Sequence, residues 1–367
     1  MQAASANGIL LPIDLAALRA GPKDLVIHYG AKEIKVNRAV ISAESAFFAT
    51  HLTTQLGKVP REGSITLKEF HPDWTPRILE LLQSGGSFLN YSFKELVEAS
   101  HQADFLQLSG EAAKQLEQAF ITHIQKETLS EIIKIARKLR YPLLERACLD
   151  FLSDEKKGIL TQEGLEQDLV LLFETSKESF REKCLFLALE KAIIYLKKGE
   201  SNRLEILKPI LKNCVFLDQL EHSGLKELRH YHLEELIRCL SPQLWGIKLE
   251  KIQTGLFFLA SCPNLTFLSI TKSTVQCIEE LQGLRKLRKI DFSGNIGKCE
   301  TRPFIFLKEL EEVNIRGFYE LGPLSYLTAC PALRKVIVDA EHPDLANLKE
   351  NWKEKLTVRP LTHEEKN

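Results

Sequence analysis

A hydrophobic pattern recurs five times in the last third of the chain, and it constrains the fold more than any other feature of the sequence. Each copy has the form Leu-x-x-Leu-x-Leu with conservative replacements. The copies are Leu244-Ile247-Leu249, Leu265-Leu268-Ile270, Leu287-Ile290-Phe292, Leu310-Val313-Ile315 and Leu333-Val336-Val338, so their starts lie 21, 22, 23 and 23 residues apart. One unit of this length cannot bury its apolar side chains alone. The copies are therefore expected to stack, each adding one strand to a shared sheet.

The period and the pattern over residues 241–340 resemble those of leucine-rich repeats. "CPNL" (Cys262 to Leu265) and "CPAL" (Cys330 to Leu333) repeat the approach to the strand. Only the central unit has the Asn that this family places after the strand, at Asn295, so we expect irregular turns. The resemblance implies a C-terminal α/β solenoid with a concave sheet.

The residues that alternate with the buried pattern are expected to face outward from that concave sheet. Phe267 and Ile337 would then be exposed apolar side chains amid mixed charge, as is typical of a protein-binding surface. The alternative is a short sheet face that is merely solvated. The predicted protein-binding residues of the concave face are Lys248, Phe267, Ser269, Lys289, Asp291, Glu312, Asn314, Arg316, Lys335 and Ile337.

The first third of the chain predicts a different arrangement. Alternating apolar residues in Leu25–His28 and Glu33–Val36 predict a β-hairpin, and Ser64–Leu67 predicts a third strand. Two short helices are expected between the second and third strands, over 37–43 and 45–52, with Ser45 as an N-cap. Two longer helices follow, and Ser92 to Glu95 ("SFKE") forms a capping box at the start of the second.

This order of elements, and the residues themselves, resemble the BTB/POZ domain over residues 20–123. The family's opening Asp with alternating β residues is Asp24-Leu25-Val26-Ile27. Its central run corresponds to Ile34, Val36, Asn37, Arg38, Val40, Ile41, Ser42, Ala43, Ser45, Phe47 and Phe48, and its later helical segment to Leu96 through Leu106. The resemblance implies a module that docks onto another protein or dimerises. Phe47 and Phe48 are expected to pack in the core.

Two positions depart from the family pattern. The family's His is replaced by Asn37, which can keep a polar contact. Where many cullin-binding BTB domains have a hydrophobic-x-Glu motif, this chain has Leu56-Gly57-Lys58, so a base replaces the acid. A reversed charge at a docking contact repels as well as fails to pair. By the resemblance, the residues that would contact a cullin are His51, Thr54, Leu56 and Lys58.

Residues 124–240 are predicted to be all helical. Two amphipathic helices on either side of Tyr141-Pro142 resemble the start of a BACK domain, and Thr128 to Glu131 predicts a second capping box. Cys148-Leu149-Asp150 matches the Cys-x-Asp motif of some bacterial ubiquitin ligases. The Cys148 side chain, however, lies on the apolar stripe, where a buried thiol is expected instead of an activated nucleophile.

The remaining composition excludes several classes of function. Forty-nine Lys and Arg balance forty-nine Asp and Glu, which argues against nucleic-acid binding, and no apolar run is long enough to span a membrane. No phosphate-binding loop, metal cluster or nucleophile-base pair is evident, so neither a cofactor nor enzymatic activity is expected. His222, His230 and His232 have no spacing typical of zinc ligands. The eight cysteines form no C-x-x-C pair, which favours reducing cytosol.

We therefore predict a multi-domain α+β chain with five segments: an N-terminal segment (1–19), the BTB/POZ domain (20–123), the BACK-like region (124–240), the repeats (241–340) and a C-terminal helix or tail (341–367). The expected function is a protein-interaction adaptor that recruits substrate proteins to a cullin-RING ubiquitin ligase. The alternative is a BTB scaffold that forms homodimers without a ligase. The combination of domains also resembles eukaryote-like proteins of intracellular bacteria, which would place such a protein in host cytosol.

Overall fold

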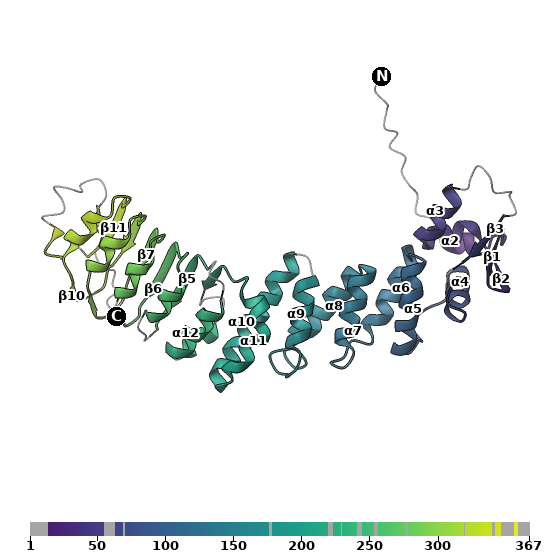
Figure 1. Cartoon of the computed structure of the whole chain (residues 1–367), viewed down its shortest axis with the longest axis horizontal. Coiled ribbons are helices and arrows are strands. Elements are labelled where there is room, and N and C mark those ends of the chain that lie inside the picture. The colour runs from purple at the N-terminus through teal and green to yellow at the C-terminus, as the bar shows by residue number, and fades with distance from the viewer. Residues whose placement is uncertain are drawn as a thin grey trace, which may run out of the picture. The chain divides into compact units, whose positions relative to one another are not determined.

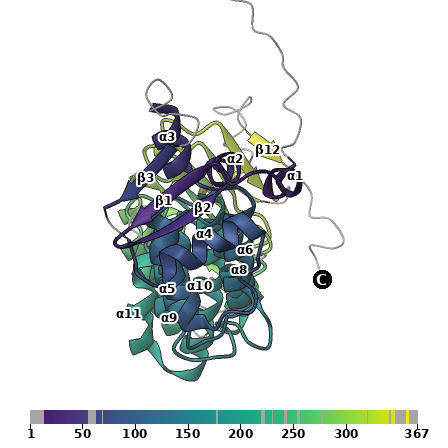
Figure 2. The same cartoon turned by 90° about the vertical axis from the view of Figure 1, so that its right-hand side faces the viewer.

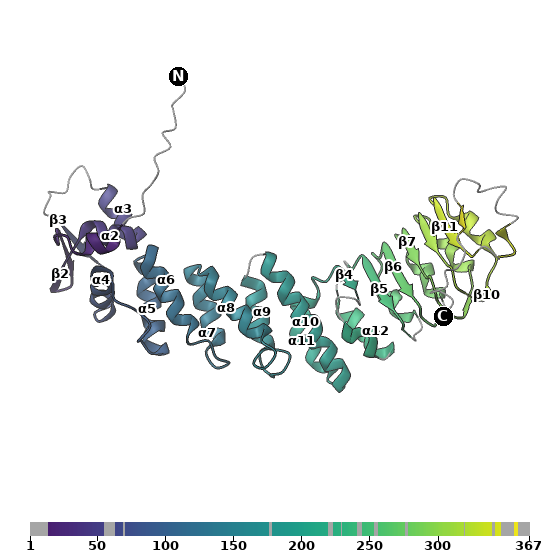
Figure 3. The same cartoon turned by 180° about the vertical axis from the view of Figure 1, so that it is seen from behind.

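The structure is a computed structural model with a mixed helix and strand fold, and it forms two compact units, Met1–Phe151 and Leu152–Asn367. Figures 1 and 3 show both units from opposite sides. The described residues are 14–54, 63–68, 70–175, 178–218, 223–228, 230–240, 244–252, 256–275, 278–318, 320–339, 342–345 and 356–358.

A three-stranded sheet organises the first unit (Figure 2). β1 (Leu25–Tyr29) lies in the centre, pairs antiparallel with β2 (Lys32–Val36), and pairs parallel with β3 (Gly63–Leu67). The alternation read from the sequence is visible in β1, where Leu25, Ile27 and Tyr29 are buried. Gly30 makes the hairpin turn at φ +59°, and a Cβ there would lie 2.9 Å from the Phe70 ring. Glycine therefore fits this turn for two reasons.

Helices complete the first unit. They are α1 (Leu15–Arg19), α2 (Arg38–Glu44), α3 (Ala46–Thr54), α4 (Trp74–Ser84), α5 (Phe93–Phe105), α6 (Gly110–Ile121) and α7 (Leu129–Leu139), and α8 (Pro142–Ser153) crosses the boundary between the units. Asn37 caps α2, since its Oδ1 accepts from two backbone amides while its Nδ2 donates to the carbonyls of Leu18 and Pro22. The expected polar contact at this position is therefore present. Both hydrogen bonds of the predicted capping box join Ser92 and Glu95.

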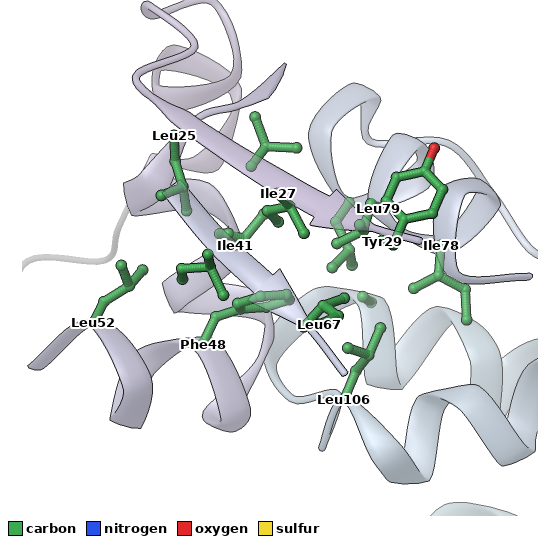
Figure 4. Packing of buried hydrophobic residues seen from close by; sticks show 14 residues of the cluster. Leu25, Ile27, Tyr29, Ile41, Phe48, Leu52, Leu67, Ile78, Leu79 and Leu106 are labelled. Carbon is green, nitrogen blue, oxygen red and sulfur yellow. The ribbon is translucent and has the colours of Figure 1, made fainter. Parts of the chain in front are cut away.

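The hydrophobic core of the first unit joins the sheet to helices α2, α3, α4 and α6 and includes Leu106, which follows α5; Figure 4 shows its packing. Phe48 is completely buried there, beside Ile27 and Leu106, as expected from the sequence. Phe47 is only half-buried and packs against the outside of this cluster. The two adjacent aromatic residues thus differ sharply in burial.

The predicted capping box at Thr128 is wrong. Thr128 has helical backbone angles, and its hydroxyl donates to the carbonyl of His123 instead of capping α7. A carboxylate on a different helix caps α8: Glu117 of α6, only 5% exposed, accepts from the backbone amide of Leu144 at 2.9 Å. Local sequence alone does not reveal this contact, because the partners are 27 residues apart.

The second unit begins with helices and continues as a parallel sheet. The helical part comprises α9 (Glu166–Thr175), α10 (Glu178–Lys198), η1 (Ser201–Arg203), α11 (Leu204–Leu211), η2 (Ser223–Glu227) and α12 (His230–Cys239). The sheet has the order β12-β11-β9-β7-β6-β5-β4, and every pairing in it is parallel.

All five strands predicted from the repeated pattern are present in that sheet: β5 (Gly246–Glu250), β6 (Phe267–Thr271), β7 (Lys289–Asp291), β9 (Glu312–Asn314) and β11 (Lys335–Val338). The three pattern residues of every copy are buried. Short 3-10 helices alternate with these strands: η3 (Phe257–Ser261), η4 (Glu279–Gly283), η5 (Arg302–Phe306) and η6 (Leu324–Ala329). A second pair, β8 (Lys298–Cys299) and β10 (Glu320–Leu321), lies beside them.

Two strands of the sheet differ from the sequence prediction. β4 (Phe216–Asp218) lies in the segment predicted to be all helical, and it pairs with β5. β12 (Leu356–Val358) lies in the segment predicted to be a C-terminal helix or tail, and it pairs with β11. Each adds an edge strand to the sheet of the five predicted copies.

Buried polar groups hold the turns that follow the strands. Asn295, completely buried, donates to the carbonyl of Ile270 and accepts from the amide of Ser273, both at 2.7 Å. Ser273 has a similar role in the preceding copy of the pattern, where its hydroxyl accepts from the amide of Ile252 at 3.0 Å. Different side chains thus satisfy equivalent backbone groups in successive copies, as the degenerate pattern suggested.

Candidate protein-binding surfaces

The residues predicted to contact a cullin fall at the end of α3 and beyond it. His51 is exposed on α3, and its ring stacks on that of Phe47 with 4.7 Å between the ring centroids. Thr54 is the last residue of α3, although its side chain lies outside the described residues. Leu56 and Lys58 also lie outside the described residues. Their roles therefore remain predictions.

A pocket of about 390 Å³ opens beside α2 and α3 in the same unit. It is lined by Pro22, Asp24, Asn37, Arg38, Ala39, Ser42, Ala49 and Leu52. Within the described segments of the chain, the Nε and Nη2 atoms of Arg38 are buried without a hydrogen-bond partner, and the nearest carboxylate oxygen of Asp24 is 4.0 Å from Nε. The pocket therefore combines an apolar wall with a guanidinium that has spare donors.

The exposed face of the seven-stranded sheet carries ion pairs that run across the strands. Lys248 on β5 lies 3.2 Å from Asp218 on β4. Glu312 on β9 lies between two lysines, 3.4 Å from Lys289 on β7 and 3.8 Å from Lys335 on β11. The Glu312 carboxylate thus forms ion pairs with two ammonium groups, and all three side chains remain roughly half exposed.

The structure brings together most of the residues predicted for this face. A depression of about 140 Å³ is lined by Lys289, Ile290, Asp291, Glu312, Val313, Asn314, Lys335 and Ile337, six of which were predicted to bind protein. Arg316 lies next to it, with its Nε 3.4 Å from Asn314 Oδ1. Ser269 differs from the expectation, because it is buried and only 5% exposed. Its hydroxyl offers little surface to a partner.

Aromatic side chains gather at the start of strands β4, β5 and β6. We call Phe216, Trp245 and Phe267 the aromatic cluster. The ring centroids of Phe216 and Trp245 are 4.9 Å apart, and those of Phe216 and Phe267 are 5.9 Å apart in a stacked arrangement. Gly246 makes room for this cluster, since a Cβ there would lie 2.2 Å from the Phe216 ring. Trp245 is 45% exposed.

Sequence reasoning found Phe267 but missed Phe216 and Trp245. Trp245 precedes the first outward-facing residue of its strand, and Phe216 belongs to the unpredicted strand β4. A signal was present nonetheless. "VFLD" (Val215 to Asp218) alternates in the same phase as the outward positions of the next strand, with Asp218 opposite Lys248.

A buried polar cluster lies among the helices of the second unit and was also not predicted. Glu166 and Lys191 are 2% and 3% exposed, and the closest atoms of their charged groups are 3.8 Å apart. Tyr195 donates its hydroxyl to Glu166, and Arg203 lies 3.6 Å from the same carboxylate. Burial lowers the pKa of Lys191, although the Glu166 carboxylate opposes that shift. Glu166 and Lys191 are enclosed by protein while Arg203 is partly exposed, so these contacts connect α9, α10 and η1.

Most cysteine side chains of the described residues are buried thiols, and Cys239 is half-buried near charged side chains. Cys148 is completely buried on α8, as its place on the apolar stripe predicted. Burial raises the pKa of Cys184, Cys262 and Cys299 to about 12, and that of Cys330 to about 11. A nucleophilic cysteine requires the opposite shift.

Alkylation of the native protein is therefore expected to spare the buried thiols. At pH 8 a thiol with a pKa of about 12 is almost entirely protonated, and raising the pH favours the thiolate only as that pKa is approached. Iodoacetamide should modify half-buried Cys239 at least about tenfold faster than Cys148 or Cys262. Peptide mapping by mass spectrometry measures these rates, and unfolding in guanidinium should equalise them. Rapid native modification of Cys148 would contradict the structural assignment.

Two other classes of site, metal sites and membrane spans, are not found among the described residues. Across these segments, no three or more His, Cys, Asp or Glu side chains are placed to hold a metal ion. Over the same segments, no helix has the length and apolarity needed to cross a membrane.

Comparisons with known proteins bear on the first unit. A profile of the BTB/POZ domain matches residues 19–124. A search of curated proteins gave no match. Among solved structures, an internalin C2 of Listeria monocytogenes is 23% identical, and the match covers 35% of this chain and 57% of that one, with a TM-score of 0.26 that is too low to relate the two folds. The profile match and the order of strands and helices in the first unit together identify residues 19–124 as a BTB/POZ domain.

Proposed function

We propose that this protein is a non-enzymatic adaptor whose BTB/POZ domain docks onto one protein while the sheet of the second unit binds another. The observation that carries this proposal is the BTB/POZ domain itself, which suggests a protein-interaction role. The second support is an exposed sheet face that carries aromatic side chains and ion pairs away from that domain in the sequence. Such a mixture is typical of protein-binding surfaces.

We assign the second unit's sheet to leucine-rich repeats, so that its exposed face is the concave face of a solenoid. The 21- to 23-residue spacing of the pattern and the alternation of parallel strands with 3-10 helices support this assignment. The helix pair α7 and α8 would begin a BACK-like stalk. The thiol state of the described cysteines fits a reducing compartment, and we place the protein in cytosol, the host's if the source is an intracellular bacterium.

The adaptor would act by proximity in a cullin-RING ubiquitin ligase. Docking of the BTB/POZ domain on the cullin would tether a substrate held by the second unit. Tethering raises the effective concentration of a substrate lysine near the charged ubiquitin carrier, and this requires no catalytic group in the adaptor.

Light scattering on a sizing column, with and without the N-terminal domain of a BTB-binding cullin, tests the ligase role. We expect a defined complex that is lost when Leu56 is changed to Asp. Lys58→Glu should strengthen the complex about three- to tenfold, because it restores the acid found in the family's docking motif. Lys32→Glu, an exposed change on β2, serves as the matched control. No complex with either the wild type or Lys58→Glu at micromolar concentrations would refute the ligase role.

A homodimeric scaffold without a ligase is the second candidate, and the pocket beside α2 and α3 favours it. Arg38 presents buried donors without hydrogen-bond partners there, among the described residues, next to an apolar wall. A second copy of the chain could supply both an acceptor and apolar side chains. The mass of the protein alone decides this point. A dimer that Arg38→Glu converts to monomer would support the scaffold, whereas a wild-type monomer would exclude it.

A further inference from the structure

The starts of the parallel strands form a continuous rim along the sheet of the second unit. Backbone hydrogen bonds connect Trp245 to Val215, Thr266 to Trp245, Arg288 to Thr266, Glu311 to Arg288 and Arg334 to Glu311, at 2.7 to 2.9 Å. Each of these residues precedes an outward-facing position of its strand. We give the name strand-start rim to the two residues at this level of strands β4, β5, β6, β7, β9 and β11, which are Val215, Phe216, Trp245, Gly246, Thr266, Phe267, Arg288, Lys289, Glu311, Glu312, Arg334 and Lys335.

The strand-start rim is divided into an apolar half and a basic half. Strands β4, β5 and β6 contribute the aromatic cluster and Val215, which is 43% exposed. Strands β7, β9 and β11 contribute four cations and two anions, which gives this half a net charge of +2. The cations are Arg288, Lys289, Arg334 and Lys335, and the anions are Glu311 and Glu312.

Both halves stay partly exposed, although Arg288 already lies 3.4 Å from Glu309 and 3.9 Å from Glu311. Glu312 is shared by Lys289 and Lys335, whose side chains are 52% and 43% exposed. Trp245 contacts Phe216 on one side and remains 45% exposed. The rim therefore presents a large aromatic contact beside cations that can accept a further carboxylate.

We propose that the strand-start rim binds an acidic segment of a partner protein, with one aromatic or large aliphatic side chain on the aromatic cluster and carboxylates on the basic half. This inference rests on the proposed adaptor function and specifies the chemistry of the partner. Neighbouring strands are about 4.8 Å apart, so β5 is about 10 Å from β7 and about 19 Å from β11. An extended peptide advances about 3.3 Å per residue, which places the acidic residues about three to six positions from the apolar anchor.

A single-stranded nucleic acid is the other polymer that aromatic and basic side chains can attract. Its phosphates would meet Glu311 and Glu312, which interrupt the row of cations. The formal net charge of the whole chain is zero, so no long-range field would draw in a polyanion. Discrete carboxylates on a peptide can instead face the cations and avoid the two glutamates.

Selection of peptides on the full-length protein tests the proposal. A phage library of random peptides of about twelve residues is selected on immobilised wild-type protein, and enriched peptides are then measured by fluorescence polarisation. We expect enriched sequences to share one aromatic or large aliphatic residue and at least two acidic residues, at the spacing given above. Failure to enrich any peptide, or enrichment of peptides without acidic residues, would overturn the proposal.

Variants with matched controls locate the binding site of the enriched peptides. Trp245→Ala should lower their affinity about tenfold, whereas Phe257→Ala, which removes a 62% exposed aromatic side chain from η3, should change it less than about twofold. Lys335→Glu should lower the affinity about fivefold, and Arg302→Glu on η5 should leave it unchanged. Equal effects at the rim and at the controls would overturn the proposal.

Three further measurements test the position of the Phe216 ring, the role of the charges and the alternative of nucleic-acid binding. Gly246→Ala keeps every side chain of the rim but displaces the Phe216 ring, so it should also weaken the peptide. A peptide whose acidic residues are changed to Lys should bind more tightly to the double variant that carries both Lys289→Glu and Lys335→Glu than to the wild-type protein. Binding of an oligothymidylate of about twenty nucleotides more tightly than any selected peptide, with loss in Trp245→Ala, would refute the proposal in favour of nucleic acid.

The peptide measurement is independent of the cullin titration. A protein that binds the cullin but no acidic peptide would keep the adaptor function and lose this inference. A protein that binds the peptides but no cullin would keep the inference and lose the ligase role.

Discussion

Replacing Phe48 with alanine is expected to lower the free energy of unfolding of the BTB/POZ domain by about 3–5 kcal/mol. The ring is completely buried between β1 and the helices, and its removal leaves a cavity that the surrounding strands cannot close. Hydrogen exchange measured by mass spectrometry on the full-length protein reports the opening of segments 25–52 separately from the second unit.

The adjacent Phe47→Ala variant is the matched control. Phe47 is half-buried, with His51 stacked on its exposed side and Phe105 5.5 Å away between ring centroids. The Phe47→Ala change should lower the free energy of unfolding by about 1–2 kcal/mol, because the Phe47 ring is only partly buried. Equal losses at the two positions would show that burial in the native structure does not govern the stability of this region.

Removing the carboxylate of Glu166 is the change with the largest expected effect on the second unit. Glu166→Ala should lower the free energy of unfolding by about 3–5 kcal/mol, because the Lys191 ammonium keeps its hydrogen bond to the Gln162 carbonyl but stays buried without a carboxylate, and Tyr195 loses its acceptor. Glu163→Ala removes an exposed carboxylate that lies 3.0 Å from Arg203, and should cost less than about 1 kcal/mol. Thermal and urea unfolding of the full-length variants measure both values.

The pH dependence of the unfolding free energy that Glu166→Ala loses shows whether the loss comes from an uncompensated charge or from lost packing. Burial already lowers the pKa of Lys191 below its value of 10.5 in the unfolded chain, and loss of Glu166 lowers it further. The folded variant therefore releases this proton before the unfolded chain does, so the penalty is present below the folded pKa and is relieved above it. The difference between the variant and the wild type should narrow as pH rises from neutral towards 10.5. A difference that stays constant over this range would point to packing alone.

A second variant checks the cause. Glu166→Gln with Lys191→Met removes both charges and keeps most of the volume, so it should recover more than half of the loss. No recovery would contradict the account based on an unpaired buried charge.

The predictable regions of the fold are those in which a single chain segment carries its own signal. The alternation in Leu25 to Tyr29, the capping box at Ser92 and the in-phase copies of the leucine pattern all express local geometry. The BTB/POZ domain could be recognised because several such signals occur in one order. The structure gives strands at every predicted copy of the leucine pattern.

The regions that were missed depend on contacts between distant segments. β4 is only three residues long, so its short alternation is too weak to predict a strand, and it becomes one by pairing with β5 about 30 residues later. Glu117 caps a helix 27 residues away, which no local motif encodes. The same holds for the surface that we propose binds protein. Phe267 could be found from the repeat alone, whereas Trp245 and Phe216 become neighbours only through the pairing of β4 with β5.

The strand order of the second unit has a consequence for how such a chain can change over time. Strands β8 and β10 form a separate pair. When they are left out, each described strand of the seven-stranded sheet pairs only with the strands that precede and follow it in the chain. Duplication or loss of one complete period of 21 to 23 residues would therefore create one new pairing between neighbouring strands and leave the other strand pairings unchanged. Because the apolar and the basic contacts sit on different strands, recombination can lengthen or shorten the gap between them in steps of one strand. If the strand-start rim binds an acidic peptide as proposed, the length of that peptide can thus evolve separately from its chemistry.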